Sequence, residues 1–226
     1  QKPETALPEG LAPGMKQIGL FLPYTPLHLL LLDRTDAPLV MTSANRSDEP
    51  IVYTREAAEE KLGAVADGFL HHNRPIVRRC EDSVASIING EPVLFRRARG
   101  YAPAPICATQ KTDHTVLALG GHLKNTFCFL KNGQAFLSPH EGDLHHPGAL
   151  SQFKADAADL AELLEMEPDT AAHDLHPDYA TTRYAEQLPP SVRRVAVQHH
   201  HAHIASCLAE NGTDEKVIGV AFDGLG

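Results

Sequence analysis

Apolar residues occur in short blocks separated by Gly, Pro and Asn, and this pattern predicts an α/β protein. Runs of four to eight apolar residues between turn residues are typical of buried strands. A further short strand is expected to begin at Pro92. The other expected strands span residues 16–23, 38–42, 69–76, 115–119, 126–130, 134–137, 171–174 and 215–223.

Other stretches repeat their apolar positions at helical spacing. Helices are expected at residues 26–33, 54–62 and 148–166, after His176 and through the histidines near residue 200. Pro26 suits a first helical turn, and Thr54 suits an N-cap position. In the long helix, apolar side chains recur every three or four residues, which predicts one face in the core. These core positions are Phe153, Ala157, Leu160, Ala161 and Leu164.

Turn signals divide the chain further. Asn89-Gly90 and Asn132-Gly133 each stand between apolar runs, and Asn-Gly is the strongest short hairpin signal. The segment 102–113 is rich in proline, alanine and polar residues, which is typical of a linker. We therefore expect one domain over residues 1–106 and a second over 107–226.

The most distinctive stretch is Gln198 to Ser206, which has four histidines within five residues. In a helix, His199 and His203 project from the same face, so two imidazoles can reach one divalent ion. Asp223 ends the last expected strand beside a glycine, where α/β folds place phosphate and metal chemistry. We predict a metal site of His199, His203 and Asp223; a histidine-rich surface patch is the alternative.

Small polar side chains and arginines follow several expected strands. Ser43 and Asn45 come after the strand at 38–42, and a cluster of arginines surrounds Arg97. Hydroxyl, amide and guanidinium groups can hydrogen-bond phosphate and carbonyl oxygens. We predict that Ser43, Asn45, Ser83 and Arg97 line one nucleotide pocket, the alternative being ordinary turns and a solvated basic edge.

Composition narrows the classes of function. The formal net charge of −9 disfavours a general nucleic-acid binder, which needs clustered Lys and Arg. The four cysteines are far apart, without zinc-finger spacing, and reduced thiols indicate a cytoplasmic enzyme. The longest apolar run, residues 27–32, is too short to cross a membrane. Residue 1 is Gln, and the chain stops in a glycine-rich stretch, so we expect a segment of a longer protein.

Nine motifs, in order along almost the whole chain, resemble one family. Met41-Thr42-Ser43-Ala44-Asn45 with Glu49-Pro50-Ile51, Asn73-Arg74-Pro75-Ile76, Glu81-Asp82-Ser83-Val84 and Arg96 to Tyr101 form the first group. Leu123-Lys124-Asn125-Thr126-Phe127, His140 to Leu144, His173 to Tyr179, Gln198 to Ile204 and Val220 to Gly224 form the second. They resemble the HypF family of hydrogenase-maturation carbamoyltransferases.

The resemblance implies a fold. The first group is similar to the C-terminal part of a YrdC-like domain, and the second to the first lobe of an ASKHA (actin-like ATPase) domain. An acylphosphatase domain, two zinc fingers and the start of the YrdC-like domain are then expected before Gln1. The second ASKHA lobe is expected after Gly226.

The resemblance also implies an activity. Carbamoyl phosphate and ATP give carbamoyl-adenylate, and the carbamoyl group passes to the C-terminal cysteine of the partner HypE, for cyanide-ligand synthesis in [NiFe]-hydrogenase. Lys124 and Asn125 then join the nucleotide-binding residues, and a divalent zinc, iron or magnesium ion joins ATP as a cofactor. Neither nucleic acid nor a membrane is an expected partner.

Two positions depart from the family pattern. Glu141 stands where an apolar residue is expected, and Leu225 replaces the threonine expected after Asp223-Gly224. The second departure leaves open whether the last residues form a phosphate loop.

Two alternatives remain at the level of sequence. The first is a tRNA threonylcarbamoyl-adenosine synthesis enzyme, because such enzymes use the same two folds and acyl-adenylate chemistry. The histidine run, Leu123 to Phe127 and the negative charge favour the hydrogenase-maturation branch. The second is a noncatalytic metal- or nucleotide-binding module.

Overall fold

The computed structural model describes residues 8–35, 37–46, 49–108 and 111–224. The chain forms two compact units, residues 1–42 and 43–226. The described part of the first unit contains a 3-10 turn, η1 (Glu9–Leu11), and helix α1 (Pro26–Thr35). Helix α1 begins at the predicted proline, which confirms the helix expected there.

The second unit begins with a short helix and a hairpin. Helix α2 (Arg55–Leu62) is capped as predicted, because the Thr54 hydroxyl accepts a hydrogen bond from the Ala57 N–H at 3.3 Å. Strands β1 (Val84–Ile88) and β2 (Glu91–Arg96) pair antiparallel. At the tip, Asn89 and Gly90 have φ of 53° and 88°. Positive φ at both positions is the geometry that an Asn-Gly hairpin turn requires.

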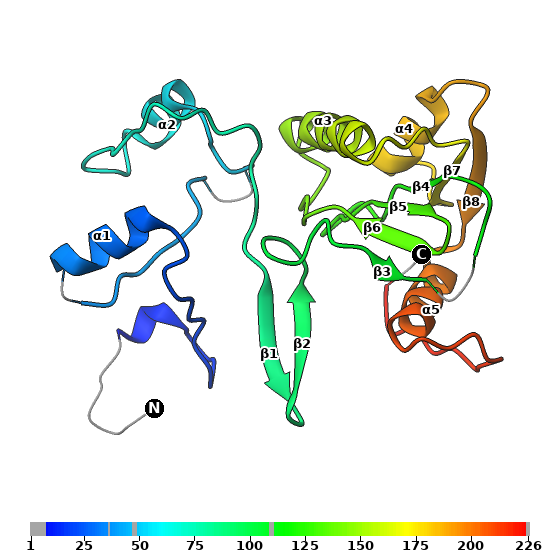
Figure 1. Cartoon of the computed structure of the whole chain (residues 1–226), viewed down its shortest axis with the longest axis horizontal. Helices are drawn as coiled ribbons and strands as arrows, with labels where there is room; N and C mark the ends of the chain where they lie inside the picture. The colour runs from blue at the N-terminus through cyan, green and yellow to red at the C-terminus, as the bar shows by residue number, and fades with distance from the viewer. Residues whose placement is uncertain (1–7, 36, 47–48, 109–110, 225–226) are drawn as a thin grey trace. The chain divides into compact units, whose positions relative to one another are not determined.

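The rest of the unit is built on a six-stranded mixed sheet (Figure 1). Its strands follow the order β3-β6-β5-β4-β7-β8, with β4, β7 and β8 parallel and the other pairs antiparallel. The strands are β3 (Ile106–Cys107), β4 (Val116–Ala118), β5 (Cys128–Lys131), β6 (Gln134–Leu137), β7 (Thr170–Asp174) and β8 (Arg193–Val197). The predicted α/β class is therefore confirmed, and the carboxyl ends of β7 and β8 meet at one edge.

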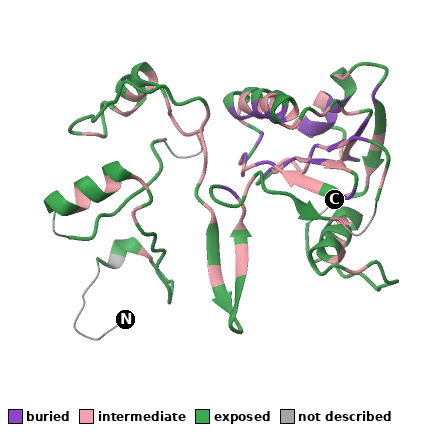
Figure 2. Ribbon diagram, viewed as in Figure 1, coloured by how far each residue is buried: buried purple, intermediate pink, exposed green. Residues whose placement is uncertain are grey.

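Three helices flank this sheet. Figure 1 shows α3 (Pro147–Leu164) and α4 (Ala180–Gln187) on one side of the sheet and α5 (His199–Glu210) on the other. The core lies under α3, where buried residues concentrate (Figure 2). It combines sheet residues with the predicted face of α3 and consists of Leu117, Leu119, Phe127, Phe129, Leu144, Ala149, Phe153, Ala157, Leu160 and Ala185.

Four expected strands are wrong. The described residues of 16–23, 38–42, 69–76 and 215–223 form neither strand nor helix. Their apolar side chains are largely open, with Leu20 85% and Phe222 99% exposed. An apolar run becomes a strand only when a neighbouring strand satisfies its backbone groups and covers one face. In the part of the chain that the structure describes, these runs are not paired in a sheet.

The predicted domain boundary after residue 106 stays a prediction.

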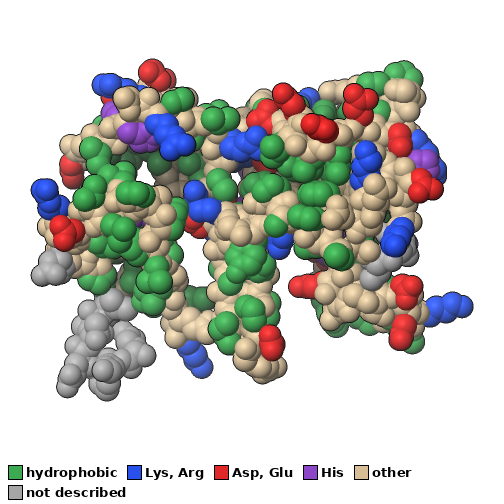
Figure 3. Space-filling view, viewed as in Figure 1, with side chains coloured by type: hydrophobic (Ala, Val, Ile, Leu, Met, Phe, Trp, Pro, Cys, Tyr) green, Lys and Arg blue, Asp and Glu red, His purple; other side chains and the backbone are tan. Residues whose placement is uncertain are grey.

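Acidic and basic side chains are interspersed on the face drawn in Figure 3, and apolar side chains gather on the β1–β2 hairpin, where Ile87 and Phe95 are exposed. Among the described residues, none of the helices combines the length and hydropathy needed to cross a membrane. Cys80, Cys107, Cys128 and Cys207 are free thiols.

Candidate metal and nucleotide site

The N-terminus of α5 presents the histidines. Strand β8 ends at Val197, and the Gln198 side chain caps the helix by accepting a hydrogen bond from the His201 N–H at 2.9 Å. This cap starts the helix at His199, so His199 and His203 are one turn apart. Their ring centroids lie 4.9 Å apart.

Asp223 completes a group of three possible ligands. One oxygen, Oδ2, lies 3.0 Å from His199 Nε2 and 2.9 Å from His203 Nε2. One ligand atom from each residue lies within 4.8 Å of the others, close enough to share an ion. The hydrogen bonds from Gly224 N–H and from His203 and His199 lower the pKa of the Asp223 carboxyl. The structure thus brings together the three residues predicted to bind metal.

A second carboxylate, that of Asp174, faces the other nitrogen of His199. Asp174 ends β7, its side chain is 6% exposed, and its Oδ2 lies 2.5 Å from His199 Nδ1. Its Oδ1 accepts the His176 N–H at 2.9 Å. The hydrogen bond that His199 donates to Asp174 is the main cause that raises the pKa of His199, and Asp223 adds to it.

Asp174 therefore fixes the His199 ring and leaves Nε2 on the side of Asp223. Metal-binding histidines almost always have such a partner on the second nitrogen. This role of Asp174 was not predicted from the sequence. The available signal was an aspartate at the end of a short strand, at the edge where parallel strands place functional groups.

The loop between β4 and β5 lies against this histidine cluster. A Cβ built on Gly121 would lie 3.7 Å from His199 Cε1. Asn125 is 1% exposed, and its amide donates to the carbonyls of Leu119 and Gly121 at 2.9 and 2.6 Å. Gly120 has φ of 70°, and a Cβ there would meet the Thr126 carbonyl at 2.4 Å. Asn125 and Gly120 together set the shape of this loop.

Lys124 belongs to the same loop but lines a separate cavity of about 300 Å³. Its backbone has φ of 48° and its N–H donates to Asp143 Oδ1 at 2.7 Å. The cavity has charged and polar walls: Asn45, Glu49, Arg79, Glu81, Arg96, Lys124, His140, Glu141, Asp143 and His145. Two of the predicted nucleotide-binding residues, Asn45 and Lys124, thus share one cavity.

The other predicted nucleotide residues have local partners. Ser43 donates to Asn45 Oδ1 at 2.5 Å and so lies beside that cavity. The Ser83 hydroxyl donates to the Arg99 carbonyl and accepts from the Ala98 N–H, both at 2.9 Å. The Arg97 guanidinium donates to the carbonyls of Tyr101 and Ala104, both at 3.0 Å. Neither Ser83 nor Arg97 lines the cavity that Asn45 lines.

The neighbouring arginines are also paired. Arg96 forms an ion pair with Glu81 at 3.2 Å, and Arg99 with Asp82 at 3.1 Å. These ion pairs connect β2 and the residues after it to the segment that precedes β1. Part of the predicted basic cluster thus serves local structure.

Glu141 stands where the family pattern predicts an apolar residue, and a buried arginine explains how a carboxyl group fits there. The Glu141 side chain is 3% exposed, and its Oε2 lies 3.3 Å from Nη2 of Arg79, which is 7% exposed. The same guanidinium donates to the Glu141 carbonyl. Burial and the neighbouring Asp156 carboxylate raise the pKa of Glu141 to about 8, against the opposing effect of Arg79. Leu225, the second departure, lies outside the described residues.

Comparisons with known proteins agree with this architecture. Residues 1–98 match the Sua5/YciO/YrdC family model, described as telomere recombination. Residues 111–210 match the model of the HypF Kae1-like domain.

Relatives with both parts in one chain are closely similar. The chain is 44% identical to the carbamoyltransferase HypF of Synechocystis over 100% of its length and 29% of that relative. Against HypF of Rhodobacter capsulatus it is 45% identical over 98% of its length and 31% of that relative.

Solved structures give the same result. A full-length HypF in the phosphate- and nucleotide-bound form is 48% identical, with a TM-score of 0.85 over 92% of this chain and 32% of that chain. The T. kodakarensis HypF is 39% identical, with a TM-score of 0.87 over 95% of this chain and 28% of that chain.

The fold and the histidine site thus define a protein that joins a Sua5/YrdC-type part to a Kae1-like domain. The HypF relatives share this combination, with similarity along almost the whole of this chain. The chain belongs to the HypF family. It spans less than a third of the length of the curated relatives it matches.

Proposed function

We propose that this chain works within an ATP-dependent carbamoyltransferase of hydrogenase maturation. The observation that carries the proposal is the 44% identity, along the entire chain, to a protein named carbamoyltransferase HypF. In the proposed reaction, water cleaves carbamoyl phosphate to carbamate and phosphate, and the carbamate oxygen attacks the α-phosphate of ATP, which releases pyrophosphate and gives carbamoyl-adenylate. The C-terminal cysteine thiol of HypE then attacks the carbamoyl carbon, its bond to the AMP phosphate breaks, and the thiol loses its proton.

His199, His203 and Asp223 are the proposed ligands of a divalent ion. Their donor set of two imidazole nitrogens and one carboxylate suits zinc or iron better than magnesium, which prefers oxygen ligands. When bound, such an ion polarises phosphate or carbamoyl oxygens. Asp174 would hold His199 as a ligand through Nε2, since its carboxylate accepts a hydrogen bond from the Nδ1–H.

The nucleotide would contact residues from both parts of the chain. Lys124 is proposed to bind a phosphate, because it lines a cavity beside Asn45. Asn125 would act by shaping the loop that also contacts His199. Ser43, Ser83 and Arg97 remain proposed adenylate residues, and ligand binding would have to release the Arg97 guanidinium from two carbonyls. The nucleotide-bound state of a 48% identical HypF supports this part of the proposal.

The cytoplasm is the proposed location, which the four free thiols support.

One experiment tests the metal-dependent activity. The full-length His199→Ala/His203→Ala variant should lose bound divalent metal and transfer of the carbamoyl group to HypE, because both imidazole ligands are removed. Metal content and radiolabelled transfer are measured against the unchanged protein and against His201→Ala, which keeps the ligand pair. Full metal stoichiometry together with full transfer in the double variant would exclude the proposed site.

A second assay separates the two acyl-adenylate enzymes. ATP–pyrophosphate exchange should depend on carbamoyl phosphate in the proposed function. Exchange that instead requires threonine and bicarbonate would identify a threonylcarbamoyl-adenosine enzyme.

A further inference from the structure

Asp223 lies on a segment that has no helix or strand to hold its backbone. Residues 214–224 form neither helix nor strand, and the Asp223 side chain is 47% exposed. A carboxylate on such a segment samples many orientations unless neighbouring groups fix it, and ordering it costs conformational entropy. The position of Asp223 beside two histidines therefore needs a physical cause.

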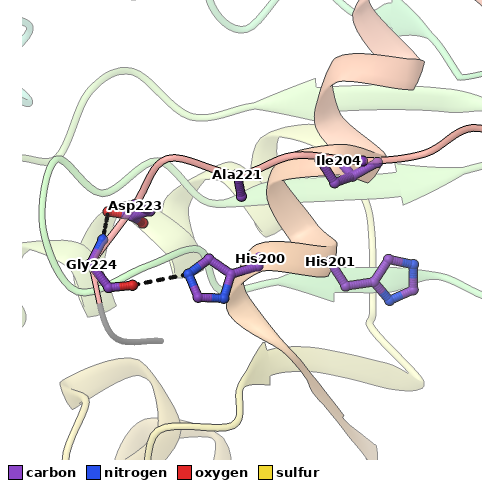
Figure 4. Close-up of a pocket in the computed structure, with 7 residues that line it drawn as sticks. His200, His201, Ile204, Ala221, Asp223 and Gly224 are labelled. Atoms are coloured by element: carbon purple, nitrogen blue, oxygen red, sulfur yellow. Dashed lines mark hydrogen bonds between the residues drawn. The ribbon is translucent and has the colours of Figure 1, made fainter.

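His200 supplies a direct contact to this segment. Its Nε2 lies 3.0 Å from the Gly224 carbonyl oxygen, and Figure 4 shows the ring of His200 directed at this carbonyl. His200 follows His199 in α5, so its ring leaves the helix on a different side from the ligand pair. One face of the helix start thus holds the histidine pair, and the next face holds the backbone after Asp223.

Gln198 determines which nitrogen of His200 carries the proton. Its Oε1 accepts the His201 N–H, so its amide nitrogen is the atom that faces His200 Nδ1, at 3.0 Å. An amide nitrogen can only donate, so His200 Nδ1 accepts and the ring proton lies on Nε2. That proton is then donated to the Gly224 carbonyl. The helix cap therefore also selects the tautomer that makes the contact.

The contact at Gly224 is transmitted to the Asp223 carboxylate. The Gly224 N–H donates to Asp223 Oδ1 at 2.8 Å, drawn as a dashed line in Figure 4. With Oδ1 held in this way, Oδ2 is the oxygen near His199 and His203. Gly224 thus connects the two groups: its carbonyl contacts the His200 ring and its N–H orients the Asp223 carboxylate.

A second contact fixes the segment further back. A Cβ on Gly219 would lie 2.5 Å from Ile204 Cγ1, so the backbone at Gly219 passes directly over the Ile204 side chain. Between these two contacts, an open hollow of about 470 Å³ is lined by Ile204, Gly219, Ala221 and Asp223 with His200 and His201. Packing at Ile204 places the segment along α5, and the hydrogen bond at Gly224 sets its end.

We propose that His200 is a positioning residue for the metal site, which orients Asp223 by holding the Gly224 carbonyl. The inference rests on the proposed metal site of His199, His203 and Asp223. His200, the second histidine of the run, thus has a role other than that of a metal ligand or of an exposed surface residue. Gln198 acts in the same chain of hydrogen bonds by fixing the tautomer.

The test measures cobalt binding to the full-length protein, with Co²⁺ as the probe. His200→Ala should weaken Co²⁺ affinity about 10-fold, the lower end of the effect expected for groups that orient ligands. The visible absorption of bound Co²⁺ should also change, because a freed Asp223 alters the coordination. His200→Gln should restore both, since a glutamine amide can donate from a position similar to that of His Nε2.

Two further variants make the result specific. His201→Ala, the matched control on the next residue, should bind Co²⁺ like the unchanged protein. In an Asp223→Ala background, His200→Ala should cause no additional loss, because the two residues act through one contact. Melting of the metal-free proteins checks that each variant is folded.

The outcomes separate this inference from the proposed function. An unchanged protein that binds no Co²⁺ removes the metal site and the inference together. Stoichiometric Co²⁺ in the unchanged protein, with equal affinity and spectrum in His200→Ala, overturns the role of His200 alone. So does an equal loss in His201→Ala, or a full additional loss in the Asp223→Ala background.

Discussion

At the scale of single residues, His199 lies between two carboxylates. Asp174 faces Nδ1 from the buried end of β7, and Asp223 faces Nε2 from an exposed segment. The two contacts differ in purpose, because only the exposed side leaves room for an ion and its other ligands. The buried side fixes the ring, since Asp174 is itself held by the His176 N–H.

Removing Asp174 should therefore weaken metal binding without removing a ligand. Asp174→Ala is expected to lower zinc affinity by about 10- to 100-fold, because the His199 ring loses its orientation and its basicity. Asp174→Asn should lose less, since its carbonyl oxygen can still accept the Nδ1 proton. Chelator competition on the full-length protein measures both affinities. Equal affinity in Asp174→Ala and the unchanged protein would contradict this role.

Glu141 predicts a dependence of stability on pH. Its pKa is raised from 4.5 to about 8, first by burial and then by Asp156. Between these values the unfolded chain releases the proton and the folded chain keeps it, so the free energy of unfolding falls as pH rises. Glu141→Gln should flatten this decline, because glutamine carries no titrating proton. Urea denaturation of the 226-residue chain from pH 4.5 to 8 measures it; an equal slope in both proteins would refute the assignment.

The site could be predicted from sequence only where one element sets the geometry. His199 and His203 are placed by one helical turn. Asp223 was predicted at the end of a strand that the structure does not form, and it reaches the histidines from an irregular segment. Asp174 lies 25 residues before its partner, and their contact depends on β7 and β8 being neighbours. The role of Ser83 and Arg97 stays a prediction, and the sequence did not reveal that their side chains hydrogen-bond to nearby backbone groups.

At the scale of elements, α3 forms the main cover of the sheet. Phe153 is 0% exposed and makes edge-to-face contacts with Phe127 and Tyr184, at centroid distances of 5.4 and 5.6 Å. Such contacts join the helix to the residue that precedes β5 and to α4 in one core. The predicted apolar face of this helix is confirmed because a 3.6-residue period needs no knowledge of the partner.

Truncating the Phe153 side chain should lower the free energy of unfolding substantially. Phe153→Ala is expected to lower the free energy of unfolding by about 3–5 kcal/mol, from lost burial and the cavity left behind. Leu163→Ala on the same helix is the control: Leu163 is 61% exposed, so a change within about 0.5 kcal/mol is expected. Urea denaturation of the 226-residue chain compares them. Similar losses for both variants would show that α3 does not pack as described.

Strands were harder to predict than helices and hairpins. Asn132-Gly133 carries its turn geometry in its own backbone preference, with φ of 52° and 75°. The runs at 16–23 and 38–42 have the composition of strands, but pairing depends on a second strand elsewhere. Local signals therefore identified the turns and helices, whereas the sheet required long-range information.

At the scale of the whole molecule, the candidate sites are open. The side chains of His203 and Asp223 are 52% and 47% exposed, and the open hollow beside Asp223 is lined by residues of α5 and of the segment 219–224. Catalysis of group transfer needs reacting groups held in place and water excluded. The HypF of Synechocystis is more than three times as long as this chain, which covers 29% of it.

The 226-residue chain should therefore fail to transfer carbamoyl groups alone. We expect labelled HypE to stay at the uncatalysed background with carbamoyl phosphate, ATP and zinc, because the reacting groups are not enclosed. The full-length protein under the same conditions is the positive control, and its His199→Ala/His203→Ala variant the negative one. Circular dichroism and urea denaturation establish that the short chain is folded, so that inactivity reflects an incomplete site. Transfer by the short chain at a rate near that of the full-length protein would show that these residues already form a complete catalytic unit.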